Sequence, residues 1–530
     1  MDGSTVIVGA GSAGGALAAR LSEDPAHEVI LIEAGPSYLD LSDEELPDDI
    51  RDAGEMSVDA HDWGLTGYFI EPAAERELQP YPRGRVVGGS GSVNAAIGQR
   101  GTSDDFARWK GAGGDDWTWD GVLPFLKRLE NDLDFGERPY HGVDGPVPIK
   151  RYHEREWAAG VQAFVQACRE RGFADCPDFN APGARGVGPT PRNLRAEVRA
   201  SSAVTYLREA YGRPNLTVIS DATCRRVLFD GTTAIGVEFE KDDGVETIHA
   251  DRVVLSAGAI HTPHLLMLSG VGPADVLSDL DIEPVLVNEA VGKNLQDHPM
   301  IPVVTLLREQ TDRLGARAEL RFTSELGENL GMADDMAVFP CVMEPSTLNL
   351  DVETKGLKAL TFISNVAKPH SVGWMTVTSA DPHVQPELHF NYLSAPEDMQ
   401  RAMASVRMIR EMAEQSPLAD EVEEIVMPDA ETTADDEKLE AWIRTVVTTA
   451  YHATSTCRMG PAEDRDSVVS PRLAVHGLQQ LWIADASVLV NVPTAFTNLT
   501  AFMIGERLAD WLTSDSPEAA AGRQPAAGSR

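Results

Sequence analysis

A glycine-rich segment near the start of the chain constrains the fold most strongly. An apolar run at residues 5–8 leads into a Gly-x-Gly-x-x-Gly pattern at 9–14, and small residues continue to position 21. A buried parallel strand that enters a helix through such a turn is typical of dinucleotide-binding folds. A second apolar run ends at Glu33, where a carboxylate can accept ribose hydroxyls. The segment predicts a Rossmann-like nucleotide-binding domain and does not separate FAD from NAD.

Each glycine of the pattern has a separate predicted task. Gly9 permits the tight turn, Gly11 lets the backbone approach a pyrophosphate, and Gly14 lets the helix pack closely on the sheet. The alternative is a glycine-rich turn without a ligand. Strand, turn, helix and distal acid together favour the nucleotide site.

The size and charge of the chain limit its function classes. With 530 residues, of which 42% are hydrophobic, the chain is long enough for a large core divided among several domains. Its net charge of −38 argues against a nucleic-acid surface, because no run of Lys or Arg offsets it. We therefore expect a globular enzyme that binds no nucleic acid.

Cysteine usage and the N-terminal residues indicate a compartment. The five cysteines lie far apart and form no Cys-x-x-Cys pair, which favours free thiols in a reducing environment. The first strand begins too early for a signal peptide to precede it, and no apolar run approaches the roughly 20 residues of a membrane span. We expect a cytoplasmic protein without a transmembrane segment.

A second glycine-rich stretch lies at residues 83–97 and ends in a run of small residues. Its glycines and serines would let main-chain N–H groups lie against a flat or phosphorylated ligand. An ordinary surface loop is the alternative reading.

The middle of the chain predicts several further elements. Short strands follow one another between residues 215 and 256, and a strand–turn–helix junction follows at 257–272. His261 and His264 in that junction could bind a metal, but without a nearby third ligand we expect none. Residues 302–390, which include apolar strands at 374–378 and 388–390, predict an antiparallel sheet inserted into the nucleotide domain and facing the substrate. Residues 398–415 predict a helix, and the Pro- and Gly-rich residues 179–193 predict a loop.

The last informative stretch contains His452, Asp485 and Asn498, followed by a predicted helix at 501–512. Asp485 ends an apolar strand, as Glu33 does, which suits contact with a chain of hydroxyls. From residue 514 to 530 the composition predicts a disordered tail.

Together these stretches resemble the glucose-methanol-choline family of flavin oxidoreductases over nearly the whole chain. The resemblance implies a mixed α/β fold with a Rossmann-like FAD-binding domain and an inserted antiparallel-sheet substrate domain. The FAD-binding domain would comprise residues 1–155, 190–305 and 445–513, and the substrate domain residues 156–189 and 306–444.

The resemblance also implies FAD as the cofactor. Some members of the family bind the flavin covalently through a histidine at the position of Val93, so the flavin here is predicted to be non-covalent. The implied cofactor-binding residues are Gly9, Gly11, Ser12, Ala13, Gly14, Glu33, Ala34, Arg85, Val87, Gly89, Ser90, Asn94, Ala95, Cys224, Asp485, Asn498, Leu499 and Thr500.

The catalytic pair implied by the resemblance is His452 and Asn498. An alcohol is a poor hydride donor until its hydroxyl proton is removed, and a neutral imidazole suits that task. An Asn side chain can donate a hydrogen bond to the developing alkoxide.

The resemblance implies an alcohol as substrate, and oxygen, a quinone or another acceptor to reoxidise the flavin. Lys368 aligns by eye with an active-site histidine of the family, and a cation there would repel choline. Tyr451 and Phe496 beside the catalytic pair would suit a neutral alcohol with an aromatic or extended apolar body. The chain also resembles mycofactocin-associated alcohol dehydrogenases and furfuryl-alcohol oxidases of the family. A non-redox lyase with the same flavoprotein fold is the alternative, and the oligomeric state is not predicted.

Overall fold

A five-stranded parallel sheet forms the centre of one half of the molecule, in the order β10-β2-β1-β14-β27. Its apolar, β-branched strands are largely buried, as expected for a parallel sheet that is covered on both faces. The strands are β1 (Ser4–Val8), β2 (Glu28–Ile32), β10 (Leu216–Ile219), β14 (Arg252–Leu255) and β27 (Leu481–Ile483). In this computed structural model the described residues are 3–53, 60–72, 78–242, 244–309, 311–348, 350 and 352–514.

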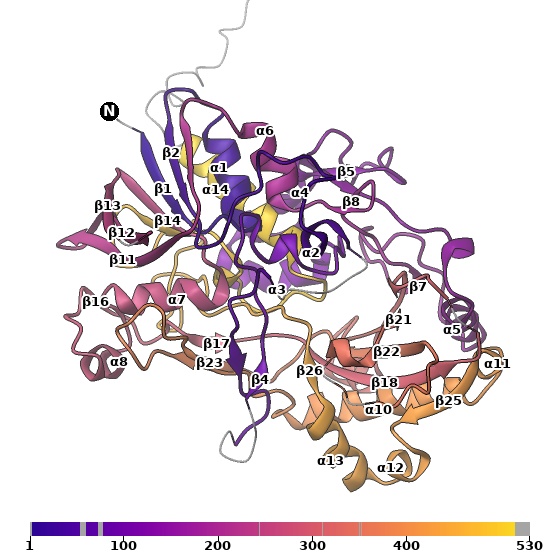
Figure 1. Cartoon of the computed structure of the whole chain (residues 1–530). Coiled ribbons are helices and arrows are strands. Elements are labelled where there is room, and N and C mark those ends of the chain that lie inside the picture. Colours follow the sequence, from indigo (N-terminus) through magenta and orange to yellow (C-terminus); the bar gives the residue numbers. More distant parts are fainter. Residues whose placement is uncertain are drawn as a thin grey trace, which may run out of the picture.

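The first and last helices of the described chain pack against each other beside this sheet (Figure 1). They are α1 (Ser12–Leu21), which leaves the glycine turn, and α14 (Asn498–Ser514). An antiparallel sheet of β11 (Ala222–Asp230), β12 (Thr233–Lys241) and β13 (Gly244–His249) lies against β14 and against α7 (Gly258–Leu268). Segments from both ends of the chain therefore build one nucleotide-binding half.

An eight-stranded, antiparallel sheet forms the other half (Figure 1). All nine residues of its central strand, β18 (Pro299–Leu307), are buried. Helix α10 (Pro396–Ala413), which begins at a proline suited to the first helical position, contacts β18 and β22. The other strands are β7 (Gly186–Pro189), β19 (Gly315–Ala316), β20 (Ala318–Phe322), β21 (Met336–Val342), β22 (Ala359–Val366), β25 (Val422–Met427) and β26 (Thr448–Thr449).

Two details of the inserted sheet differ from the prediction. The strands predicted at 374–378 and 388–390 belong to a separate three-stranded sheet of β17 (Lys293–Leu295), β23 (Gly373–Thr376) and β24 (Glu387–His389). Conversely, the Pro- and Gly-rich segment around residue 188, predicted as loop, supplies β7. Alternation indicates a strand but does not indicate its partner, because pairing depends on contacts that are distant in sequence.

The mixed α/β fold with a parallel nucleotide-binding sheet and an inserted antiparallel sheet is confirmed. The exact division into domains stays a prediction, and β18 crosses its boundary at 305–306. Of the predicted tail, Ser514 ends α14 and residues 515–530 lie outside the described part. No helix among the described residues is both long and apolar enough to cross a membrane.

The remaining helices with eight or more residues complete the two halves. They are α3 (Ser103–Gly113), α4 (Trp119–Leu129), α5 (Ala159–Glu170) and α13 (Asp436–Val446). Helix α4 packs on α14, and α5 contacts β7, β20 and β21.

Candidate active site

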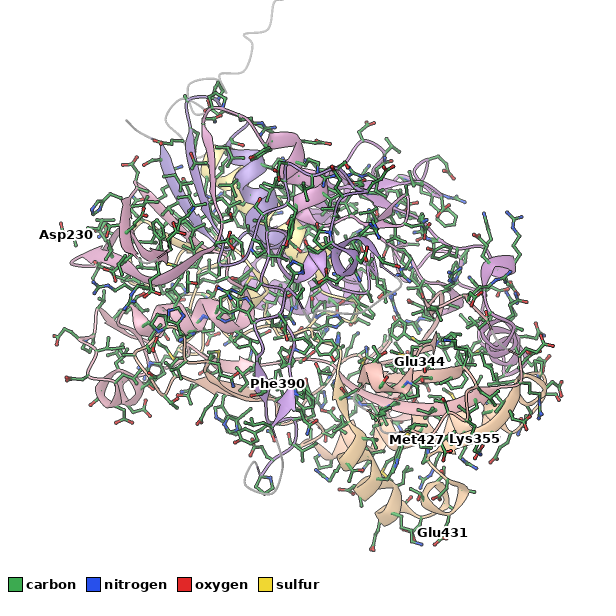
Figure 2. All side chains as sticks on the ribbon, viewed as in Figure 1. Asp230, Glu344, Lys355, Phe390, Met427 and Glu431 are labelled. Carbon is green, nitrogen blue, oxygen red and sulfur yellow. The ribbon has the colours of Figure 1, made fainter. Side chains whose placement is uncertain are left out.

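A cavity of about 940 Å³ joins the two halves of the molecule. Its wall includes residues at the carboxyl ends of the parallel strands and residues of β18, β21 and β22. Figure 2 labels Glu344, an exposed residue of the cavity wall, above the large sheet on the side of the nucleotide-binding half. Ligands of open parallel sheets bind at these carboxyl ends, so the cavity lies where a dinucleotide is expected.

Most of the predicted site residues meet on the wall of this cavity. Those on the wall are Gly9, Gly11, Ser12, Ala13, Glu33, Ala34, Gly89, Ser90, Asn94, Ala95, Cys224, His452, Asp485 and Asn498. Those that do not line it are Gly14, Arg85, Val87, Leu499 and Thr500. Val87 and Leu499 are core residues, and the Arg85 guanidinium lies 5.1 Å from the centre of the Trp63 ring.

The three glycines of the first motif have the geometry predicted for them. Gly9 has a φ of 100°, a conformation that other residues rarely adopt. A Cβ atom on Gly14 would lie 2.0 Å from the Gly9 carbonyl oxygen, so only glycine lets α1 approach the turn this closely. A Cβ atom on Gly11 would meet no described atom within 4 Å, because this residue faces the cavity.

Substitutions at two of these glycines should separate folding from cofactor binding. We expect Gly11→Val to change the free energy of unfolding of the FAD-free protein by no more than about 0.5 kcal/mol, while FAD uptake is lost. Gly14→Val should destabilise the protein by about 1–3 kcal/mol through overpacking. Thermal unfolding and flavin absorbance measure the two effects. Equal destabilisation by both variants would contradict the assignment of Gly11.

Two buried acids at strand ends bind backbone donors. Glu33 accepts from the N–H groups of Ala10 and Gly35, at 2.9 and 3.0 Å, and burial raises its pKa to about 7. Asp485 accepts from the Gly258 N–H at 2.9 Å and therefore caps the start of α7. Burial also raises the pKa of Asp485. Both carboxylates line the cavity, and their hydrogen bonds hold the backbone of Ala10, Gly35 and Gly258 in place.

His452 is 7% exposed, and a neighbouring imidazole determines its tautomer. The His298 Nε2 atom lies 3.2 Å from the Ala367 carbonyl oxygen, which can only accept, so Nε2 carries the proton. Burial lowers the pKa of both histidines, so each ring is neutral. Nδ1 of His298 must then accept from Nδ1 of His452, 2.9 Å away. The unprotonated nitrogen of His452 is therefore Nε2.

A buried carboxylate that the sequence did not point to holds this histidine pair. Asp297 Oδ1 accepts from the backbone N–H groups of His298 and His452, both at 2.7 Å. Its Oδ2 accepts from three hydroxyl groups, those of Tyr81 at 2.8 Å, Tyr392 at 2.7 Å and Thr449 at 2.6 Å. Five donors thus converge on one side chain. No pattern within residues 290–300 indicates this role, because four of the five donors come from three distant segments.

Asn498 lies at the nucleotide motif rather than against the imidazole of His452. Its Oδ1 accepts from the Ser12 hydroxyl at 2.7 Å, and its buried Nδ2 has no hydrogen-bond partner among the described residues. The side chain that packs on the His452 ring is Phe496, with ring centres 4.6 Å apart. The position beside the imidazole is thus apolar. These contacts favour a cofactor role for Asn498 over the predicted role beside the alcohol.

The argument from Lys368 against choline is wrong. Its ammonium group is buried and donates to Asp104 and to the Ala333 carbonyl oxygen. Lys368 does not line the cavity that contains His452. The family resemblance predicted a cation in the substrate site, whereas the Lys368 side chain points to α3.

The two histidines of α7 are neutral, and a different group has the spacing of metal ligands. Burial lowers the pKa of His261 to about 3 and that of His264 to about 4. Within the described chain, ligand atoms close enough to share a metal occur only in Glu130, Asp132 and His141.

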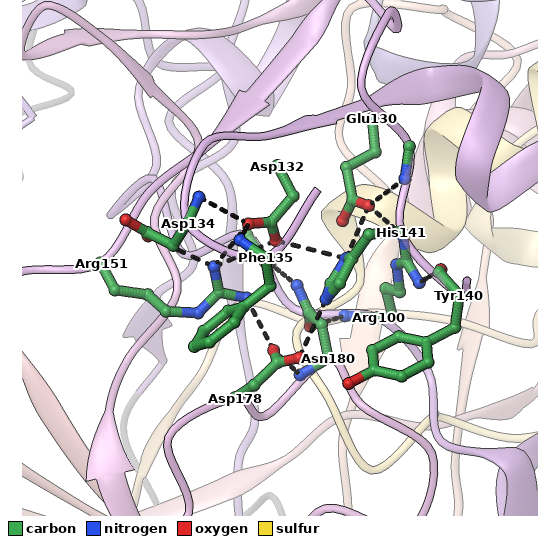
Figure 3. Close-up of polar contacts among 12 residues, drawn as sticks. Arg100, Glu130, Asp132, Asp134, Phe135, Tyr140, His141, Arg151, Asp178 and Asn180 are labelled. Carbon is green, nitrogen blue, oxygen red and sulfur yellow. Dashed lines mark hydrogen bonds and ion pairs between the residues drawn. The ribbon is translucent and has the colours of Figure 1, made fainter. Parts of the chain in front are cut away.

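Figure 3 shows that this group belongs to an ion-pair cluster. The ring nitrogens of His141 contact Glu130 and Asp178, both at 2.9 Å. Burial alone would lower the pKa of His141, but hydrogen bonds to Asp178 and Glu130 raise it to about 9. A protonated imidazole has no lone pair for a metal. Arg100 and Arg151 supply two further positive charges to the cluster.

The fold and the cavity together define a protein of the dinucleotide-binding class with a buried imidazole on the cavity wall. The GMC oxidoreductase family models match residues 4–300 and 369–505, and the chain belongs to this family. It is similar to 5-(hydroxymethyl)furfural oxidase of Methylovorus sp. (strain MP688), with 35% identity over 95% of this chain and 97% of that protein. It is 34% identical to the mitochondrial choline dehydrogenase of Mus musculus, over 95% of this chain and 88% of that protein.

Solved structures agree with this membership. The crystal structure of pyridoxine 4-oxidase from Mesorbium loti superimposes with a TM-score of 0.88 and 28% identity, covering 97% of this chain and all of that one. The protein is therefore an oxidoreductase of the GMC family.

The cavity suits FAD on grounds of its own. Helix α1 begins at Ser12, and its N-cap residue Gly11 has no side chain to cap the first N–H groups, which leaves them to bind a phosphate. The orphaned Nδ2 of Asn498 lies beside this helix start. A bound dinucleotide would satisfy these donors.

Proposed function

We propose that the protein oxidises an alcohol to an aldehyde or ketone, with His452 as the general base. The observation that carries this proposal is the His298–His452 pair, which leaves Nε2 of a neutral imidazole unprotonated on the wall of the cavity. Nε2 accepts the hydroxyl proton of the alcohol, and the carbon–hydrogen bond becomes a hydride donor. FAD, when bound, supplies the hydride acceptor.

The other residues of the site hold the imidazole pair, bind the cofactor and shape the cavity beside His452. Asp297 keeps the imidazole pair in place through its two backbone hydrogen bonds. We assign Asn498 and Ser12 to cofactor binding at the start of α1, together with Gly11. Phe496 forms an apolar wall against His452, which keeps water from the base.

We propose a substrate with a flat apolar body. Tyr451 and Phe496 line the cavity, and Phe339 packs on Phe496 with ring centres 5.2 Å apart. The similarity to a hydroxymethylfurfural oxidase supports an aryl or heteroaryl alcohol. Oxygen, a quinone or a mycofactocin-type acceptor would then reoxidise the flavin.

Anaerobic mixing of the FAD-loaded protein with a panel of alcohols tests the proposal. Bleaching of the oxidised flavin absorbance by at least one benzylic or furfuryl alcohol is the expected result. A lyase that keeps FAD as a structural group would leave the flavin absorbance unchanged with every alcohol. That outcome would contradict the proposed oxidation. Admission of air, quinone or dye acceptors to the reduced protein identifies the acceptor.

The flavin should be released when the protein is denatured. Val93 lines the cavity and carries no atom that can form a bond to the flavin ring. After acid precipitation we expect all of the yellow colour in the supernatant, identified as FAD by chromatography. Colour that stays in the pellet would show covalent attachment and contradict the assignment.

We also propose a cytoplasmic location. All five cysteines are free thiols, which suits a reducing compartment. Cell fractionation tests the location, and recovery outside the cytoplasm would contradict it.

A further inference from the structure

A buried arginine lines the same cavity as His452. Arg192 is 5% exposed and follows β7 in the chain. Its Nε donates to the Ala96 carbonyl oxygen at 3.2 Å, and its Nη1 donates to the Ala316 carbonyl oxygen at 2.9 Å. A guanidinium group has five N–H donors, so these bonds orient the side chain without saturating it.

No described carboxylate forms an ion pair with Arg192. The acid that affects its charge is Glu197, which already binds Lys150 and Tyr152. The other titratable neighbours are Tyr152, Cys341 and the cationic Arg199 and Arg317. Burial lowers the pKa of Arg192, but an arginine stays protonated in proteins. A buried charge without a partner is unfavourable, so the site is electrostatically prepared for an anion.

The cavity provides a continuous apolar path from the base to this cation. Phe496 packs on His452, and Phe339 packs on Phe496. Two residues beyond Phe339 on the same face of β21, roughly 7 Å away at strand spacing, lies Cys341. Cys341 pairs with Ala316, whose carbonyl oxygen accepts from Arg192. Phe339, Cys341, Ala316 and Arg192 all line the cavity.

We propose that Arg192 binds a carboxylate at the end of the substrate remote from the hydroxyl group. The preferred substrates would then be hydroxymethyl aryl or heteroaryl carboxylates, with a spacer of about one ring. This inference rests on the alcohol oxidation proposed above and specifies which alcohols the protein prefers. It also replaces Lys368 as the reason to expect poor activity on choline, because like charges repel within a cavity of low dielectric.

A matched pair of substrates tests the proposal. With wild-type protein, para-(hydroxymethyl)benzoate should reduce the flavin with a second-order rate constant about 10- to 100-fold higher than para-methylbenzyl alcohol, the gain typical of a charged hydrogen-bonded pair. Arg192→Met should remove this preference for the carboxylate substrate, and Arg192→Lys should keep part of it. Arg317→Gln is the control, because Arg317 affects the charge of Arg192 but does not line the cavity. It should leave the ratio within about 2-fold.

Each result has a separate meaning. If both alcohols reduce the flavin of the wild type, but para-(hydroxymethyl)benzoate does so no faster than para-methylbenzyl alcohol, the assignment of Arg192 is overturned. The proposed alcohol oxidation then still stands. Failure of every alcohol overturns the oxidation itself. As a readout that needs no turnover, para-methylbenzoate should raise the melting temperature of the FAD-loaded wild type, whereas para-methylbenzamide should not. Equal effects of the two would also overturn the proposal, even if Arg192→Met does not fold.

Discussion

Replacing His452 by glutamine lowers the rate of flavin reduction by alcohol about 10²- to 10⁴-fold, the contribution typical of a general base. Glutamine keeps a polar side chain of similar length but cannot accept the hydroxyl proton. Stopped-flow absorbance under anaerobic conditions measures the rate, and FAD content and melting temperature should stay near those of the wild type. A variant that retains FAD and reduces it within about 3-fold of the wild-type rate would remove His452 from the mechanism.

The pH dependence of the same reaction gives a second check. Burial, together with the neighbouring His298 and Arg83, holds the pKa of His452 well below its usual range. A base with a lowered pKa stays unprotonated as the pH falls, so the rate should be constant from about pH 8 to about pH 6 and decline only in more acidic solution. A decline centred near neutral pH would contradict the neutral, buried pair.

Replacing Asp297 by alanine destabilises the protein by more than about 4 kcal/mol, or prevents it from folding. The carboxylate accepts five buried hydrogen bonds, and each donor left without a partner costs about 1–3 kcal/mol. The midpoint of urea unfolding of the FAD-loaded protein measures the loss.

The matched control removes one donor and keeps the acceptor. In Tyr392→Phe the ring remains and the hydrogen bond to Asp297 is lost, so we expect a loss of only about 1 kcal/mol. If Asp297→Ala and Tyr392→Phe differ by less than about 1 kcal/mol, the five-donor network does not hold the catalytic segment together.

Local patterns were sufficient to predict the backbone geometry of the first glycine turn. The turn, the open approach and the close packing predicted for Gly9, Gly11 and Gly14 depend on backbone geometry within one strand–turn–helix unit, and the structure has all three. The strand-end position of Glu33 follows from the same unit, because β1 and β2 pair in register up to Ile32.

The catalytic half was less predictable. Phe496 lies two residues before Asn498, the first residue of α14, and a sequence pattern cannot tell which of them faces His452. Lys368 was misplaced for a similar reason, since only the tertiary structure brings its ammonium group to Asp104 of α3.

The sequence by itself determined the parallel nucleotide-binding unit and the glycines of its turn, because each rests on a short run of residues with its own physical signature, whereas His452 was predicted only through the family resemblance. Only the tertiary structure decided how that histidine is tuned and what faces it. Asp297, His298, Phe496 and Arg192 come from separate segments, and their roles arise from burial and hydrogen bonds that exist only after those segments meet.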